Sequence, residues 1–376
     1  MAEARKRSTA RKDSASSIGA DRLPWLESPE NVWGIPVLDL RSIVGGLTSM
    51  SEDPQVAANA VSFGSDDGLG FAEDSPVVDR TVECELRFRV DRVLADGALF
   101  LPSCMEEKWA LYIHRERLLC IRSWQRRVFV TAGVRVEGNE AIIGPLQGAF
   151  GLWTEPIALS VRMLDFVIRS HGLSELLPAP LAEEPSDLQS VVMECFGIWG
   201  KRAQLAAHAD LPPGRPSRFL RTQSLFHIAV ARGNRTEAAR QLLAGVPVDL
   251  LSVEGLSAAH WALGSKDAGM LEWLLERGCP VDVRSGEGAT PLMQAVQADR
   301  LDDVSLLLDR GADPNASDAR GYTALHRAAE TGKTRIVQRL LERGADPGIV
   351  AQGTTARQLA EQHNHTAVLT YFPVER

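Results

Sequence analysis

Residues 323–346 decide the fold of the C-terminal half of the chain, with the sequence TALHRAAETGKTRIVQRLLERGAD. Segments similar to its first six residues begin at Ser224, Ser257 and Thr290, so each step along the chain is 33 residues. A second motif, Leu-Leu-x-x-Gly, recurs with the same period and ends at Gly278, Gly311 and Gly344. Two motifs that share one period indicate repeated copies of a single supersecondary unit.

The residue types in each repeat suit a pair of short helices. Thr or Ser at the head can accept a hydrogen bond from a free backbone N–H as a helix N-cap, and Pro291 is tolerated because the first turn needs no donor there. The glycine after the leucine pair can end the second helix in a left-handed conformation. One such unit cannot cover its own apolar face, so stability must come from stacking on its neighbours. We therefore predict a helical solenoid over residues 217–376.

These motifs resemble the ankyrin repeat family, whose pattern is Gly-x-Thr-Pro-Leu-His-x-Ala followed by Leu-Leu-x-x-Gly-Ala-Asp-Pro. The segments 311–316 and 344–347 match the second half of the pattern closely. A degenerate last copy begins at Gly353 and ends near Phe372. The resemblance covers residues 221–376 and implies four repeats with a C-terminal cap.

The resemblance also implies a function, because family members bind proteins on a concave surface of turn tips and inner helices. Carried over to the variable positions of this chain, that surface gives a set of partner-binding candidates: Glu254, Leu256, Glu287, Gln297, Arg320, Tyr322, Glu330 and Thr331. Tyr322 with Arg320 is the pair most typical of an interface anchor. The alternative for each position is an ordinary solvated side chain.

Histidines recur at equivalent positions of three repeats, namely His227, His260 and His326. A metal column is one interpretation, but Met293 interrupts it. The family resemblance implies a structural role, in which each ring bonds backbone groups of the adjoining turn. His363 and His365 have i,i+2 spacing, which would separate their rings on a helix. We expect no metal site.

The first 210 residues divide into three segments. Residues 1–23 form a basic tail without hydrophobic periodicity, which predicts disorder. Residues 24–80 combine an apolar strap, containing Trp25 and Trp33, with an acidic loop and a short helix over Pro54–Val61; the two Trp require another surface to cover them. Residues 81–210 form a domain that we do not assign to a family, and a boundary is expected at 211–216.

The pattern of residues 81–210 predicts strands followed by helices. Strict alternation over Val82–Val90 predicts one half-buried strand, and Gly138-Asn139 suits a tight hairpin turn. Further strands are expected at Trp109–His114, Arg117–Arg122, Arg127–Val136 and Glu140–Ile143. Helices are expected from 157 to 172 and from 186 to 205, the second shielding the open end of the solenoid. The fold class is therefore α+β: an antiparallel β-sheet domain with helices, then an all-α ankyrin-repeat solenoid.

Composition excludes several classes of protein. The 376 residues are 44% hydrophobic and 24% charged, and the net charge of -8 disfavours a general nucleic-acid or anionic-membrane binder. No apolar run approaches the roughly 18 residues that a membrane helix needs, and the first twenty residues lack the apolar core of a secretory signal. Five widely spaced cysteines suit a reduced, cytoplasmic compartment. The Ala- and Arg-rich composition suggests a bacterial source.

Common catalytic motifs are missing from the sequence, including the phosphate-binding Gly-x-x-x-x-Gly-Lys loop and the Gly-x-Ser-x-Gly elbow. We therefore expect a non-catalytic adaptor or scaffold with a protein partner, no cofactor and no membrane contact. One alternative is an enzyme or ligand-sensing β-domain whose target the repeats recruit. Another gives the Arg-rich strands a phosphate or nucleic-acid role, although we favour arginines neutralised by the acidic segment 51–80. Self-association stays open.

Overall fold

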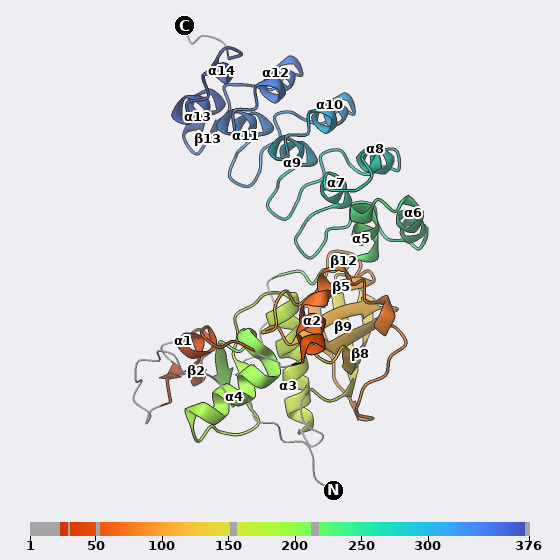
Figure 1. The fold of residues 1–376 in the computed structure, drawn as a ribbon, viewed down its shortest axis with the longest axis vertical. Coiled ribbons are helices and arrows are strands. Elements are labelled where there is room, and N and C mark those ends of the chain that lie inside the picture. Colours follow the sequence, from red (N-terminus) through yellow and green to blue (C-terminus); the bar gives the residue numbers. More distant parts are fainter. Residues whose placement is uncertain (1–22, 29–30, 50–52, 151–155, 212–217, 373–376) are drawn as a thin grey trace.

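The computed structural model describes residues 23–28, 31–49, 53–150, 156–211 and 218–372. The predicted basic tail, apart from Leu23, and most of the predicted boundary at 211–216 lie outside these residues. A β-rich N-terminal part carries a row of helix pairs that ends at the C-terminus (Figure 1). Within the described part of the chain, no helix is long and apolar enough to cross a membrane.

An antiparallel sheet of eight strands dominates the N-terminal part, in the order β12-β5-β6-β7-β8-β9-β3, with β4 also paired to β9. Its strands are β3 (Thr81–Val82), β4 (Leu86–Arg89), β5 (Gly97–Phe100), β6 (Trp109–His114), β7 (Arg117–Arg122), β8 (Arg127–Glu137), β9 (Glu140–Gly148) and β12 (Gln223–Ser224). The predicted antiparallel meander and its hairpin turn at Gly138 are confirmed. The single strand predicted over Val82–Val90 is wrong, because Cys84 and its neighbours separate β3 from β4.

Both faces of this sheet are covered, because side chains of successive strand residues point to opposite faces. On one face Trp109 lies in an aromatic cluster with Phe150 and Trp199. On the other face Tyr112 contacts Phe71, which stacks on Phe63. Those two Phe belong to the predicted acidic segment, where the structure has the expected helix α2 (Pro54–Val61) followed by the short helical turns η2 (Ser62–Ser65) and η3 (Leu69–Phe71).

A second sheet has four short strands in the order β1-β2-β11-β10. They are β1 (Trp25–Leu26), β2 (Val37–Asp39), β10 (Ala179–Pro180) and β11 (Leu205–Ala207). The predicted strap therefore forms a hairpin of β1 and β2, in which β2 also pairs with the distant strand β11. A short helix, α1 (Arg41–Val44), follows it.

Two longer helices pack against these sheets. The first, α3 (Ile157–Val167), continues into a single π-helical turn, η4 (Ile168–Gly172), as the expected helix to 172 requires. The second, α4 (Leu188–Trp199), begins at the expected N-cap Asp187 but ends before Gly200, whose φ is +62°. The prediction that it reaches 205 is wrong, since Leu205 opens β11.

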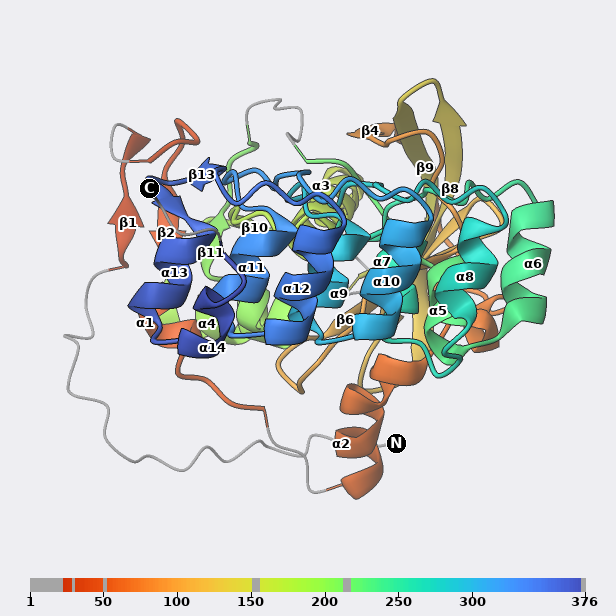
Figure 2. The same ribbon diagram turned by 90° about the horizontal axis from the view of Figure 1, so that it is seen from above.

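Five helix pairs follow and share one continuous apolar core from Phe226 to Phe372. The pairs are α5 (Leu225–Arg232) with α6 (Arg235–Leu243), α7 (Ala258–Ala262) with α8 (Met270–Leu275), α9 (Pro291–Gln297) with α10 (Leu301–Asp309), α11 (Ala324–Glu330) with α12 (Thr334–Glu342), and α13 (Ala356–Gln362) with α14 (Thr366–Leu369). Thr290 and Thr323 accept hydrogen bonds from backbone N–H groups as the predicted N-caps. Seen from above, the pairs follow one another in a row (Figure 2). The predicted helical solenoid is thus confirmed for the C-terminal half.

The sheet, and not α4, covers the open end of the helix row. Strand β12 pairs with β5, and the Leu225 N–H at the start of α5 donates to the Asp96 carbonyl (2.8 Å). Ion pairs join Arg92 to Asp249 (2.6 Å) and Arg232 to Asp67 (3.3 Å) across the same junction. Figure 1 shows α4 away from α5, so the predicted shielding role of the 186–205 helix is wrong.

Candidate partner-binding surface

Three loops between the helix pairs project on the side of the inner helices, and we call them the first (250–257), second (283–290) and third (316–323) finger. Each closes with the same backbone hydrogen bond: Ser252 N–H to Leu256, Ser285 N–H to Ala289, and Asp318 N–H to Tyr322. Neighbouring fingers are also joined, because the Gly286 N–H donates to the Gly255 carbonyl (2.7 Å) and the Ala319 N–H to the Glu287 carbonyl (3.1 Å). The finger tips therefore form a continuous hydrogen-bonded rim.

A hollow of about 490 Å³ lies between the first two fingers and the inner helices. Four of the predicted partner-binding residues line it, namely Glu254, Leu256, Glu287 and Gln297. Glu254 and Glu287 are exposed on adjacent tips, and within the described residues neither carboxylate forms an ion pair. We call this hollow the finger hollow.

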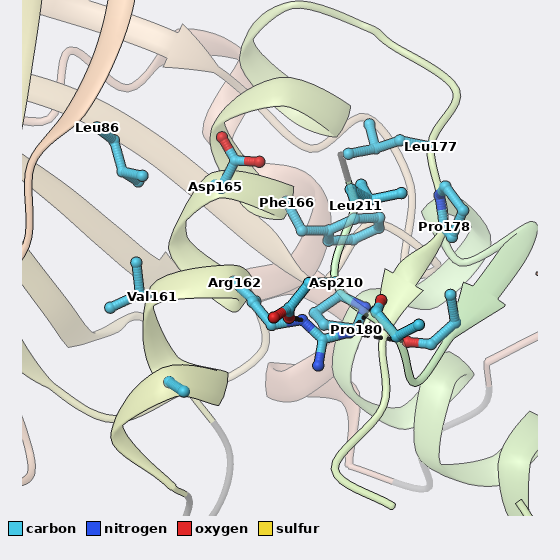
Figure 3. Close-up of a pocket in the computed structure, with 13 residues that line it drawn as sticks. Leu86, Val161, Arg162, Asp165, Phe166, Leu177, Pro178, Pro180, Asp210 and Leu211 are labelled. Carbon is cyan, nitrogen blue, oxygen red and sulfur yellow. Dashed lines mark hydrogen bonds and ion pairs between the residues drawn. The ribbon is translucent and has the colours of Figure 1, made fainter. Parts of the chain in front are cut away.

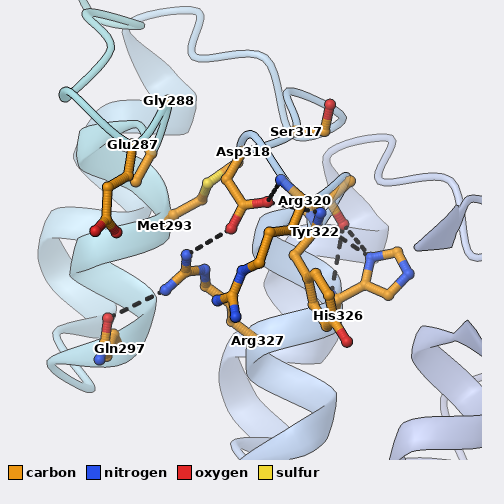
Figure 4. A network of polar contacts seen from close by, with 12 residues as sticks. Glu287, Gly288, Met293, Gln297, Ser317, Asp318, Arg320, Tyr322, His326 and Arg327 are labelled. Carbon is orange, nitrogen blue, oxygen red and sulfur yellow. Dashed lines mark hydrogen bonds and ion pairs between the residues drawn. The ribbon is translucent and has the colours of Figure 1, made fainter. Parts of the chain in front are cut away.

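The third finger carries the predicted anchor pair beside a polar network (Figure 4). The Arg320 guanidinium lies 5.4 Å from the centre of the Tyr322 ring, and that ring meets the His326 ring at 5.6 Å. Buried Asp318 accepts the backbone N–H groups of Arg320 and Tyr322, at 2.9 and 3.0 Å. The side chains of Arg320 and Tyr322 are therefore carried by a turn that the buried Asp318 carboxylate stabilises.

Arg327 is a residue of this surface that the sequence prediction missed. One of its terminal nitrogens donates to Gln297 Oε1 (3.2 Å) and the other to Asp318 Oδ2 (2.8 Å), so it links two repeats (Figure 4). Burial disfavours the charged form of Asp318, but the backbone donors and Arg327 together hold its pKa below the usual value. Arg327 stands between the motif residues His326 and Ala328, at a variable position, which is the only signal that could have identified it.

The predicted residues Glu330 and Thr331 lie apart from the finger hollow, at the C-terminal end of α11. The Thr331 hydroxyl donates to the Arg327 carbonyl (2.7 Å). The Glu330 backbone carbonyl contacts His365 Nε2 of the terminal cap (3.0 Å), while the Glu330 side chain is exposed. The structure therefore brings four predicted residues together, places Arg320 and Tyr322 on the next finger, and separates these two.

We expect D318A to lower the free energy of unfolding by about 2 kcal/mol, because it removes the acceptor of two backbone N–H groups and the partner of Arg327. The matched control is D318S, since Ser252 and Ser285 fill the equivalent position in the other fingers and accept backbone N–H groups there. D318S should recover roughly half of the loss. Urea unfolding checks both, and D318A as stable as the unaltered chain would contradict the role of Asp318.

Two of the three repeat histidines bond the adjoining turn through Nε2. Nε2 of His227 contacts the Leu250 carbonyl (3.0 Å), and Nε2 of His260 contacts the Ala289 carbonyl (3.1 Å), as the resemblance implies. His326 differs, because its Nδ1 contacts the Thr323 hydroxyl (2.8 Å) while its buried Nε2 has no hydrogen-bond partner among the described residues. Burial lowers the pKa of His227 to about 4 and also lowers that of His260. In the described part of the chain, no group of three His, Cys, Asp or Glu side chains could hold a metal ion.

The two histidines of the terminal cap differ from their prediction. The rings of His363 and His365 stack with their centres 6.2 Å apart. Separation of these rings was expected from helical spacing, but both residues flank Asn364, which turns the chain with a φ of +59°. The helical argument is therefore wrong at this place.

The Arg-rich strands are largely engaged by protein groups. Arg126 pairs with Asp66 and lies over the Phe63 ring, and Arg115 pairs with Glu73 (3.4 Å). Both acidic partners belong to the segment 51–80, as the favoured interpretation requires. Arg122 donates to the Ile198 carbonyl (2.6 Å). Such arginines have few donors left for phosphate groups.

A separate cavity of about 460 Å³ lies in the N-terminal part, between α3 and the strands β10 and β11 (Figure 3). Its walls are mainly apolar, with Val161, Phe166 and Leu177 among them. Arg162 also lines it, but donates to the carbonyls of Ala207 and Ala209 and pairs with Asp210 (3.2 Å). The sequence does not reveal this cavity, because its walls come from several separate segments between Leu86 and Leu211.

Comparison with known proteins gives matches in the C-terminal half only. Residues 226–318 match a family model described as ankyrin repeats (3 copies), and residues 307–360 match one described as ankyrin repeats (many copies). The N-terminal part matches no family model. No curated protein matches the chain.

Proposed function

Since residues 226–360 form an ankyrin-repeat domain, a protein-interaction module, we propose that the chain is a non-catalytic adaptor of the cytoplasm. It binds its partner on the surface formed by the three fingers and the inner helices. The finger hollow is the observation that carries this proposal, because it places four predicted contact residues around one concavity.

The rigidity of the fingers supports the same proposal. A partner that binds a preformed surface avoids the cost of ordering loops on association. Here the hydrogen bonds from Gly286 to Gly255 and from Ala319 to Glu287 fix the tips relative to one another before any partner arrives. Gln297 and Tyr322 are in turn positioned by the network around Asp318 and Arg327.

Among the described residues, none from the N-terminal part lines the finger hollow. In the described residues, the N-terminal part contacts the repeat domain at β12, at α5 and at the first helix pair, through Asp96, Arg92 and Asp67. The residues that line the finger hollow all belong to the repeats. The surface is therefore available for another protein.

We expect the double variant R320A/Y322A to weaken capture of the partner at least about tenfold, because Tyr and Arg anchors carry much of the binding energy of an interface. The free energy of unfolding should fall by less than about 1 kcal/mol, since both side chains are at least partly exposed. The measurement is affinity purification from the native cell with quantitative mass spectrometry, followed by titration of the protein recovered.

The matched control is R335A/Y371A, which removes one Arg and one Tyr that are exposed on the outer helix row and at the terminal cap. This control should capture the partner as the unaltered chain does. Equal capture by R320A/Y322A and by the control would reject the finger surface.

A further inference from the structure

A second hollow, of about 200 Å³, lies where the repeat domain meets the N-terminal part, and we call it the junction hollow. Its walls come from β5, from the π-helical turn η4, from β12 and from the first finger, and they include Phe100, His171, Ser174, Gln223, Val253 and Glu254. Glu254 lines the finger hollow as well. The two hollows therefore share one wall residue at the tip of the first finger.

His171 brings an unsatisfied hydrogen-bond acceptor to this hollow. The residue is only 1% exposed, and Nε2 has no hydrogen-bond partner among the described residues. The Ser170 hydroxyl donates to the Phe166 carbonyl (2.6 Å), so its oxygen is left to accept from His171 Nδ1 (2.8 Å). Nδ1 thus carries the hydrogen and Nε2 a lone pair.

The charge state of His171 agrees with this assignment. Burial, and then the nearby Arg202, keep the pKa of His171 well below its usual value, so the ring is neutral. The Phe100 ring meets the imidazole edge to face at 4.9 Å and limits its rotation. A buried acceptor with no donor is uncommon in folded proteins and calls for a partner.

At the mouth of the junction hollow, the groups without a partner are also acceptors. Glu254 is exposed and, within the described residues, forms no ion pair. The cations nearby are engaged. Arg221 pairs with Asp91 (2.6 Å), Arg218 donates to the Leu173 carbonyl (3.0 Å), and Arg202 pairs with Glu107 (3.3 Å). A ligand that fits both groups must supply a hydrogen-bond donor to His171 Nε2 and a positive charge beside the Glu254 carboxylate.

We propose that the junction hollow receives a lysine or arginine side chain from an extended segment of the protein partner, with Glu254 at the mouth and His171 Nε2 inside as its acceptors. The apolar walls at Leu99 and Leu101 suit the aliphatic stem of such a side chain. This subsite rests on the proposed function, because the same partner segment continues into the finger hollow, where Glu287 offers a second carboxylate.

The test uses the full chain and four pools of end-blocked random hexapeptides, each with lysine, arginine, norleucine or glutamate fixed at one central position. Fluorescence anisotropy measures binding of each pool. The lysine or arginine pool should bind at least about tenfold more tightly than the norleucine and glutamate pools, and E254Q and H171F should each reduce that preference to about threefold or less.

Matched controls are E184Q and H208F, which make the same changes at exposed positions of the N-terminal part. Both should keep the full preference. E254Q alters an exposed side chain, so it carries the test if H171F fails to fold. The variant R320A/Y322A should weaken all four pools alike and leave the preference unchanged.

Three results would overturn the subsite: equal binding of the four pools, no binding of any pool, or a preference for basic residues that survives in E254Q. In each case His171 Nε2 would be satisfied by a trapped water only. The proposed function fails in a different way. Pools that keep their basic preference but do not respond to R320A/Y322A would retain the subsite and reject the finger surface.

Discussion

Replacing Gly97 with alanine is expected to lower the free energy of unfolding by about 3 kcal/mol or more. Gly97 has a φ of +148° and faces Ser224 where β5 pairs with β12. An added Cβ would lie 2.3 Å from the Gln223 carbonyl oxygen and 2.6 Å from Ser224 Cα, both of them backbone atoms that cannot rotate away. The added methyl group must therefore push β5 and β12 apart.

The control for this variant is G138A, at the hairpin tip between β8 and β9. Gly138 also has a positive φ, of +61°, but a Cβ added there would meet no heavy atom within 4 Å. G138A thus measures the backbone cost alone, about 1 kcal/mol. Chemical unfolding should show a larger loss of unfolding free energy in G97A than in G138A. In G97A the repeat domain and the sheet should also unfold in separate transitions. Equal losses in the two variants would refute the close approach at Gly97.

Acidification should destabilise the protein through its buried histidines. The pKa of His227 is about 4 in the folded chain, whereas the ordinary value for a solvated histidine is 6.5. Above pH 6.5 the ring is neutral in both states, and as the pH falls from 6.5 toward 4 only the unfolded state takes up the proton. Stability is therefore lost over this interval, by about 3 kcal/mol from His227 alone.

The variant H227M isolates this contribution, because Met293 already occupies the equivalent position of the third repeat. H227M should cost about 1–2 kcal/mol at pH 7.5 through the lost bonds to Ser224 and Leu250. That difference should shrink and then change sign as the pH falls toward 4, because the loss of about 3 kcal/mol from His227 is absent in H227M. Urea unfolding at several pH values follows both proteins, and parallel stability curves would contradict the neutral state of His227.

The repeat domain could be predicted because its signals are local. Each helix start at Thr290 or Thr323 depends on bonds within one turn, and the 33-residue period carries the same signals through every copy. The strands β6 and β7 are likewise predicted with their observed bounds, and Gly138 marks the hairpin between β8 and β9, because these signals lie within the strands and turns themselves.

The features that the sequence did not predict depend on distant partners. Gln223 and Ser224 form a strand only because β5 lies beside them, and two residues carry no periodicity. The apolar pattern continues past Trp199, but Gly200 approaches the Glu106 carbonyl so closely that the chain must turn there. Glu254 and Tyr322 could be selected as candidate site residues because they occupy variable positions near the repeat motifs. The role of Arg327 could not be predicted, because its partners Gln297 and Asp318 belong to two different repeats that meet only in the fold.

Ser224 is at once the last residue of β12 and the N-cap of α5, and the next N–H is held by Asp96. No flexible linker separates sheet from stack at this point. A force applied to the helix row would therefore be transmitted directly to the sheet. In the function that we propose, this junction would orient the bound partner relative to the sheet as well as tethering it.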